Sequence, residues 1–253
     1  MSDFSVTNSL YGSYEKLSSG SKINSAADDA AGLAITEKLE SQKNSYDVGA
    51  DNAATSQDMT DVAEGALSSI TDALQRMKEL SLQAKNAFYG DGEKKAIQTE
   101  IDRLKSSISD IAANTQFNTL NLLDGSMGES NVVTNPDGSG SVIDMPVATL
   151  ESLGLADYDV TGEFDMSAID KALEKVTMAR SELGATSNGL DYAINYNSYA
   201  SYNLTAAKSS KADTDFAEEI SELKKNQILN EYQLMMQKKK EEEEEGVVRL
   251  LKF

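Results

Sequence analysis

Residues 15–35, EKLSSGSKINSAADDAAGLAI, predict a turn that leads into a closely packed helix. Serine and glycine at 18–21 interrupt periodic structure, because both residue types favour turns. Ser25 can cap a helix, and Asp28 three residues later places negative charge near the positive end of the helix dipole. The alanines that follow leave a thin helix surface that neighbouring helices can approach closely. We therefore predict that a helix of a bundle begins near Ser25.

Composition argues against several classes of partner. The 253 residues are 40% hydrophobic and 6% aromatic, so an elongated fold would have a thin core. A net charge of -19, from 42 acidic and 23 basic residues, opposes binding to nucleic acid or to an anionic membrane surface. No run is long enough to span a membrane, and the first residues lack the features of a secretory signal. The protein is expected either to stay inside the cell or to leave by a route that reads no such signal.

The chain contains no cysteine, histidine or tryptophan. Thiol nucleophiles, disulfides, imidazole bases and the usual soft metal ligands are thereby excluded. Asp28 and Asp29 form the obvious carboxylate pair, but adjacent helical side chains point about 100° apart and do not converge on one substrate atom. We expect no enzyme activity, no cofactor and no metal site.

Long helices are predicted on both sides of a short middle segment, because the only two prolines are Pro136 and Pro146. Apolar residues on each side of a turn at 88–92 recur at spacings of three and four, as in the seam of a coiled coil. The predicted seam consists of Met59, Val62, Ala66, Ile70, Ala73, Met77 and Leu80, then Ile97, Ile101, Leu104, Ile108 and Ile111.

Residues 118–165 contain turn sequences and short β-favouring pieces, which predict a small hairpin. Helical spacing returns after Met166 at Ile169, Leu173, Val176, Arg180 and Leu183. Four tyrosines then follow at spacings of four, three and three: Tyr192, Tyr196, Tyr199 and Tyr202. Most fall on one helix face, and the sequence leaves open whether they form a core or a contact between subunits.

Several stretches resemble bacterial flagellins, beginning with residues 15–35. The others are LQRMKELSLQA at 74–84, IQTEI at 97–101, TQFN at 115–118, LLDG at 122–125, IDKAL at 169–173, RSELGA at 180–185, DTDFA at 213–217 and QIL at 227–229. The ordered matches cover nearly the whole chain apart from about 126–165. So many matches in order are more specific than any single motif.

The resemblance implies a mainly α fold, an elongated antiparallel helical bundle or coiled coil with a small β-hairpin region. It implies five segments: an inner-domain remnant at 1–14, the rod domain at 15–125 and 166–205, a short variable segment at 126–165, and an inner-domain helix at 206–253. The variable outer domains of larger flagellins are expected to be missing.

Two departures from the family put the inner domain in question. Only 14 residues precede Glu15, about half the usual number, so most of the N-terminal inner-domain helix is expected to be absent. KKKEEEEE at 238–245 replaces a mainly small, polar and apolar sequence. We expect a solvated, partly frayed helix there.

The resemblance implies a structural subunit of the flagellar filament, self-assembling for motility and secreted through the flagellar export channel. Its implied partners are copies of itself, an export chaperone, hook–filament junction proteins and host Toll-like receptor 5. Matching the motifs places the receptor or subunit contacts on Gln75, Arg76, Leu80 and Glu100. Leu80 also continues the apolar seam, so a purely structural role is the alternative for that residue.

Two alternatives to the filament subunit stay open. The first is a secreted or junctional homologue that does not polymerise alone and acts as a receptor ligand. An intracellular acidic coiled-coil scaffold would also fit the periodicity and the charge, although the ordered motifs disfavour it.

Overall fold

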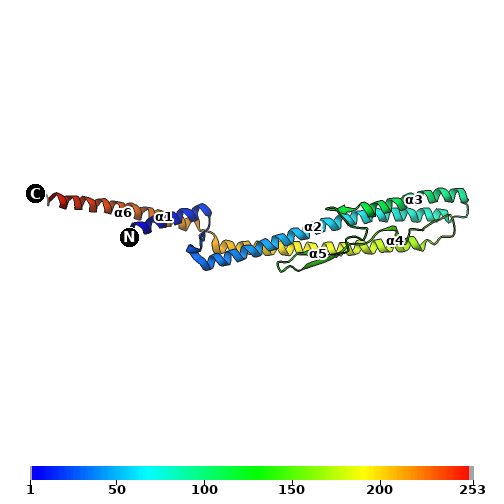
Figure 1. The fold of residues 1–253 in the computed structure, drawn as a ribbon, viewed down its shortest axis with the longest axis horizontal. Coiled ribbons are helices and arrows are strands. Elements are labelled where there is room, and N and C mark those ends of the chain that lie inside the picture. Colours follow the sequence, from blue (N-terminus) through cyan, green and yellow to red (C-terminus); the bar gives the residue numbers. More distant parts are fainter. Residues whose placement is uncertain (1, 251–253) are drawn as a thin grey trace. The chain divides into compact units, whose positions relative to one another are not determined.

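The computed structural model describes residues 2–250 and the side chains of residues 8–247. Its helices are α1 Ser2–Ser19, α2 Ala26–Ala84, α3 Asp91–Asn114, α4 Leu150–Leu153, α5 Ser167–Ala212 and α6 Phe216–Leu250. Its strands are β1 Gln116–Phe117, β2 Leu120–Asn121, β3 Glu129–Val133 and β4 Gly140–Asp144 (Figure 1). The predicted fold class, mainly helical with a small β region, is confirmed.

The chain divides into two compact units. The central unit is Asn44–Ala200, and the terminal unit combines Met1–Lys43 with Ser201–Phe253. The sequence placed the boundaries between inner domain and rod domain at 14/15 and 205/206, whereas the boundaries between the two compact units lie at 43/44 and 200/201. Residues 1 and 251–253 of the expected inner-domain segments lie outside the described part of the chain.

The seam of α2 differs from the predicted one at three positions. Val62 is 42% exposed and Ala66 is only partly buried, whereas Ala63 and Leu67 are fully buried. Buried positions alternate at spacings of three and four through Ala53, Ser56, Thr60, Ala63, Leu67, Ile70, Leu74, Met77, Ser81 and Ala84. The prediction was therefore right at Met59, Ile70, Met77 and Leu80 and wrong by one residue at Val62, Ala66 and Ala73. Small and hydroxylated residues at buried positions such as Ser56, Thr60 and Ala63 hide the seam from a search for large apolar side chains.

The polar seam residues are satisfied within the helix. Ser56 and Ser81 donate to the carbonyl oxygens of Asn52 and Met77, at 2.9 and 2.7 Å. The hydroxyl of Tyr158 in turn donates to Ser81 Oγ at 2.8 Å, and burial raises the pKa of that tyrosine. These bonds remove the cost of burying a hydroxyl, so a hydroxylated seam stays compatible with close helix packing.

The helices α3 and α5 complete the core of the central unit. Ile97, Ile101 and Ile108 of α3 are buried as predicted, and Leu104 and Ile111 pack beside them. On α5 the buried apolar residues of this unit are Ile169, Ala172, Val176, Leu183 and Leu190. Arg180, predicted in this seam, instead pairs with Glu64 of α2 through Nη2–Oε1 and Nε–Oε1 distances of 2.6 and 3.0 Å.

The predicted hairpin forms from β3 and β4, which pair antiparallel from Glu129 with Asp144 to Val133 with Gly140. Asp137 accepts from the backbone N–H and the hydroxyl of Ser139, at 2.9 and 2.6 Å, and these bonds lower its pKa. A second, two-residue pair, β1 with β2, lies before it.

Side chains of the long helices hold the tip of this hairpin. Asn52 of α2 donates to the carbonyl oxygen of Val133 at 2.9 Å, and Asn197 of α5 donates to that of Thr134 at 2.8 Å. A Cβ at Gly49 would lie 2.3 Å from the Thr134 oxygen, so this close approach requires glycine.

In the terminal unit α1 runs alongside α6 (Figure 1). Lys16 Nζ lies 3.8 Å from Glu219 Oε2, and Gln227 donates to the Tyr14 hydroxyl at 3.1 Å. As residue numbers fall along α1 they rise along α6, so the two helices are antiparallel. The helix α1 has 18 residues and runs through Ser18 and Ser19, so the interruption predicted at 18–21 begins only at Gly20.

Replacing Leu67 by alanine tests the corrected seam. We expect Leu67→Ala to lower the free energy of unfolding by about 2–5 kcal/mol, because it leaves a cavity at a fully buried site. The matched control, Val62→Ala, removes a 42% exposed side chain and is expected to cost less than about 1 kcal/mol. Urea unfolding followed by circular dichroism measures both, and equal losses would contradict the new phase.

Candidate interaction surfaces

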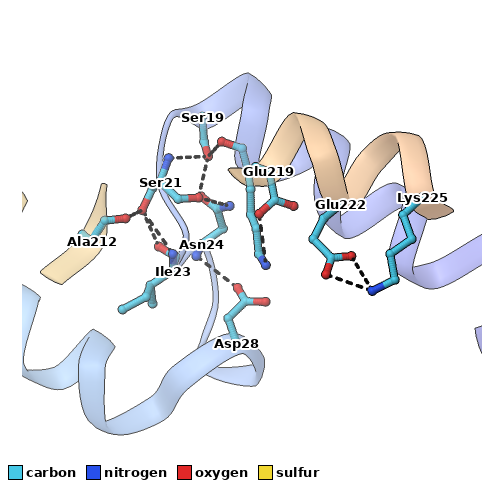
Figure 2. Close-up of polar contacts among 10 residues, drawn as sticks. Ser19, Ser21, Ile23, Asn24, Asp28, Ala212, Glu219, Glu222 and Lys225 are labelled. Atoms are coloured by element: carbon cyan, nitrogen blue, oxygen red, sulfur yellow. Dashed lines mark hydrogen bonds and ion pairs between the residues drawn. The ribbon is translucent and has the colours of Figure 1, made fainter. Parts of the chain in front are cut away.

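Two linkers of the terminal unit are joined by backbone hydrogen bonds. One connects α1 to α2, and the other connects α5 to α6. Lys22 donates its backbone N–H to the Ala212 carbonyl at 2.6 Å, and Thr214 donates to the Gly20 carbonyl at 2.9 Å. The Ser21 hydroxyl also lies 3.0 Å from the Ala212 oxygen (Figure 2). Segments almost 200 residues apart in the sequence are thus joined by backbone bonds, with Ser21 opposite Asp213.

Asp28 holds the linker that precedes α2. Its Oδ2 atom accepts from the backbone N–H groups of Asn24 and Ser25 at 3.0 and 2.8 Å, and from the Ser25 hydroxyl at 3.0 Å. Figure 2 shows the bond from Asn24. These bonds favour the charged carboxylate and lower the pKa of Asp28. The predicted helix start near Ser25 is confirmed, because α2 begins at Ala26. The bond from the Ser25 N–H to Asp28, three residues later, is one half of a capping box.

Asp29 interrupts α2 and caps the part that follows. Its backbone is extended, with φ -159° and ψ 96°, and its Oδ1 accepts from the Gly32 N–H at 2.8 Å. This is the bond of an N-cap residue, so uninterrupted helix begins at Ala30. The two adjacent carboxylates therefore have separate structural roles and form no catalytic pair.

Gly32 is required by this cap. A Cβ at residue 32 would lie 2.3 Å from Asp29 Oδ2 and 2.8 Å from Ile23 Cδ1. The aspartate must therefore move if any side chain is introduced. Both features, the cap and the glycine, fall inside the sequence stretch from which the fold was predicted.

The four tyrosines of α5 are on the surface. Tyr192, Tyr196, Tyr199 and Tyr202 are 60–79% exposed, which excludes the core alternative for them within a single chain. Tyr196 makes an edge-to-face contact with Tyr46 at a ring-centroid distance of 6.0 Å. We call the four residues the tyrosine stripe.

Three of the four residues matched to a contact surface are accessible. Arg76 of α2 pairs with Glu100 of α3 through Nη2–Oε1 and Nε–Oε1 distances of 2.8 and 3.0 Å, and with Glu79 at 3.0 Å. Gln75 is exposed beside Arg76. Leu80 is only 2% exposed, so its side chain packs in the core and is not on the surface that the others share.

Apolar residues are spread around α6 and many stay exposed. They include Phe216, Ile220, Ile228, Leu229, Tyr232, Leu234, Met235, Met236 and Val247. These apolar residues are mixed with charged ones and are not confined to one face, and α1 is the helix packed against α6 within the described residues.

The central unit has a surface hollow beside α4. The hollow beside α4, about 530 Å³, is lined by acidic and backbone groups including Asp157, Asp159 and Glu163. Within residues 2–250 no three His, Cys, Asp or Glu side chains are placed to hold a metal ion. Across the same range no helix is long and apolar enough to cross a bilayer.

Comparison with known families gives two matches along the chain. Residues 5–127 match the bacterial flagellin N-terminal helical region, and residues 166–251 match the bacterial flagellin C-terminal helical region. A flagellin of Halalkalibacterium halodurans is 35% identical over 94% of this chain and 90% of its own length. A flagellar filament 30.7 kDa core protein of Treponema maltophilum is 33% identical over 96% of this chain and 92% of its own.

A solved structure shares the fold. It is that of a putative flagellar hook-associated protein from Vibrio parahaemolyticus, with a TM-score of 0.63 over 74% of this chain and 100% of that one. Its sequence identity is 16%, so the likeness concerns the fold alone.

Substituting glycine at two positions of α2 tests the Asp29 cap. We expect Gly32→Ala to lower the free energy of unfolding by about 0.5–2 kcal/mol, the usual cost of losing an N-cap. Gly65→Ala is the matched control: nothing lies within 4 Å of a Cβ there, so it should be neutral or stabilise by up to about 1 kcal/mol. Thermal unfolding measures both, and a stabilising Gly32→Ala would contradict the role of the cap.

Proposed function

Because this chain belongs to the bacterial flagellin family, we propose that it is a structural subunit of a flagellar filament and assembles with copies of itself. The observation that carries the proposal is the tyrosine stripe, whose members are 60–79% exposed on one long helix. Large exposed aromatic surface is typical of contact sites between proteins. A chain without a chemical centre in its described residues, but with such a surface, is suited to assembly.

The terminal unit supports the same proposal. The helix α6 exposes apolar side chains around its circumference, and α1 can cover only part of it. Burying such side chains stabilises by about 1.5–3 kcal/mol each when they become fully covered. Contacts between two different surfaces, repeated from copy to copy, build an open filament when the rotation between copies does not close into a ring.

We extend the proposal to how the protein reaches the filament. The family resemblance indicates that the protein is exported unfolded through the flagellar channel to the outside of the cell. A chain without cysteine forms no disulfide that would hinder such passage. The exposed apolar residues of α6, such as Ile228 and Met235, would need cover before assembly. A dedicated export chaperone and the hook–filament junction proteins are the partners that we infer for this helix.

A second candidate function is recognition by host Toll-like receptor 5. The specific observation in its favour is that Arg76 and Glu100 are held together by an ion pair and stay accessible, with Gln75 beside them. We propose these three residues as the contact, and we assign Leu80 to the packing beneath it. A filament that buries this face would compete with the receptor.

Seeded growth tests the tyrosine stripe. We expect purified monomer to extend seeds of its own filaments or of a full-length flagellin, as seen by electron microscopy and sedimentation. Tyr192→Ser/Tyr199→Ser should slow growth about tenfold or more, because two aromatic contacts are lost. The control Tyr192→Phe/Tyr199→Phe retains the aromatic area and should grow within about threefold of the parent. Growth of the serine variant at the parental rate would remove the stripe from the interface.

Binding of the monomer to the purified receptor ectodomain tests the second function. We expect Arg76→Ala to weaken binding by about tenfold or more, since a charged contact is lost. Lys78→Ala is the matched control, because Lys78 lies on the same helix and pairs with Asp170 at 2.6 Å. Surface plasmon resonance measures both, and equal effects of the two substitutions would contradict the assignment.

A further inference from the structure

The run KKKEEEEE at 238–245 lies in the second half of α6 with its side chains exposed. None of its three lysines or five glutamates takes part in an ion pair within the described part of the chain. The helix packed against α6 is shorter than α6: α1 has 18 residues and α6 has 35, so α1 can pack along only about half of α6. Among the side chains that the structure describes, residues 8–247, these eight charged residues thus have no ion-pair partner.

The order of the charges does little for the helix that carries them. Lysine four residues before glutamate is the weaker orientation of such a pair on a helix. The run is therefore better explained by contacts outside its own helix than by stabilisation of α6.

The two blocks match each other across copies. The lysine block is centred on Lys239 and the glutamate block on Glu243, four residues or about 6 Å further along the helix axis. Two parallel copies of α6 in level register would place like charges side by side. A shift of about 6 Å along the axis instead sets the lysines of one copy against the glutamates of the next.

We propose that residues 238–245 form an electrostatic clasp between neighbouring, parallel copies of α6 that are staggered by about one helical turn. This inference rests on the proposed self-assembly. The occupant is a second copy of this chain, because the run carries both halves of a complementary pair. An antiparallel pair would also match the charges, but its two-fold symmetry closes into a dimer and does not continue a filament.

Two further observations favour this occupant. Met235, Met236 and Val247 on either side of the run are 49–62% exposed, so the clasp is continuous with apolar surface that also needs cover. Copies that each carry a net charge of -19 repel one another. Local pairing of opposite charges lowers that repulsion where the helices approach.

Charge reversal in each half, followed by mixing, tests the clasp. Lys239→Glu/Lys240→Glu removes the positive block, and Glu242→Lys/Glu243→Lys removes the negative one. We expect each double variant alone to extend seeds about tenfold more slowly than the parent in dilute buffer, where screening is weak. An equal mixture of the two should recover to within about threefold, because each supplies the block that the other lacks.

The matched control for the lysine-block variant is Lys94→Glu/Lys95→Glu near the start of α3. It changes the net charge by the same amount and in the same direction as Lys239→Glu/Lys240→Glu. It should grow within about twofold of the parent, and in about 0.5 M salt the differences among all variants should shrink. Circular dichroism establishes that each variant keeps its helix content.

The outcomes separate the clasp from the filament function. If the parent extends seeds and the double variants extend them equally fast, the clasp is overturned and the filament function stands. The same holds if the mixture of the two double variants grows no faster than either variant alone. A parent that extends neither kind of seed would overturn the filament function and the clasp together. A two-fold dimer of the parent in sedimentation, abolished by either double variant, would replace the staggered arrangement by the antiparallel one.

Discussion

The alternating three and four spacing of buried residues along α2 is the constraint on which the central unit depends. It gives α2 a narrow buried face from Ala53 to Ala84, against which the buried faces of α3 and α5 pack. Several seam residues are small or hydroxylated, and their hydroxyl groups bond within the molecule. Such a seam allows close helix packing with few large side chains, which agrees with a chain that is only 40% hydrophobic.

A narrow core leaves much of the apolar surface uncovered. The tyrosine stripe remains exposed in the single chain, and so do many apolar residues of α6. Both facts have the same physical origin, because a helix pair or a three-helix layer covers only one face of each helix. Function in such a chain is carried by the faces that a neighbour completes, as filament assembly requires.

Pairing of the two linkers places the beginning and the end of the chain in one unit. Residues 20–22 meet residues 212–214 through backbone bonds, while Asp28 and Asp29 set the direction in which α2 begins. Sequence reasoning identified both stretches and assigned the carboxylates to a helix start. It did not identify the pairing, because an isolated bridge of backbone groups leaves no pattern in the side chains.

The sequence by itself determined the helical class, the hairpin in the middle, the start of α2 and the absence of cysteine and histidine chemistry. These follow from local rules of spacing, turn residues and composition. Only the tertiary structure decided the phase of the seam, the burial of Leu80, the exposure of the tyrosines and the ion pair of Arg180. Spacing identifies a face of a helix, but whether that face is covered depends on which other helices lie against it, and those contacts join residues far apart in the sequence.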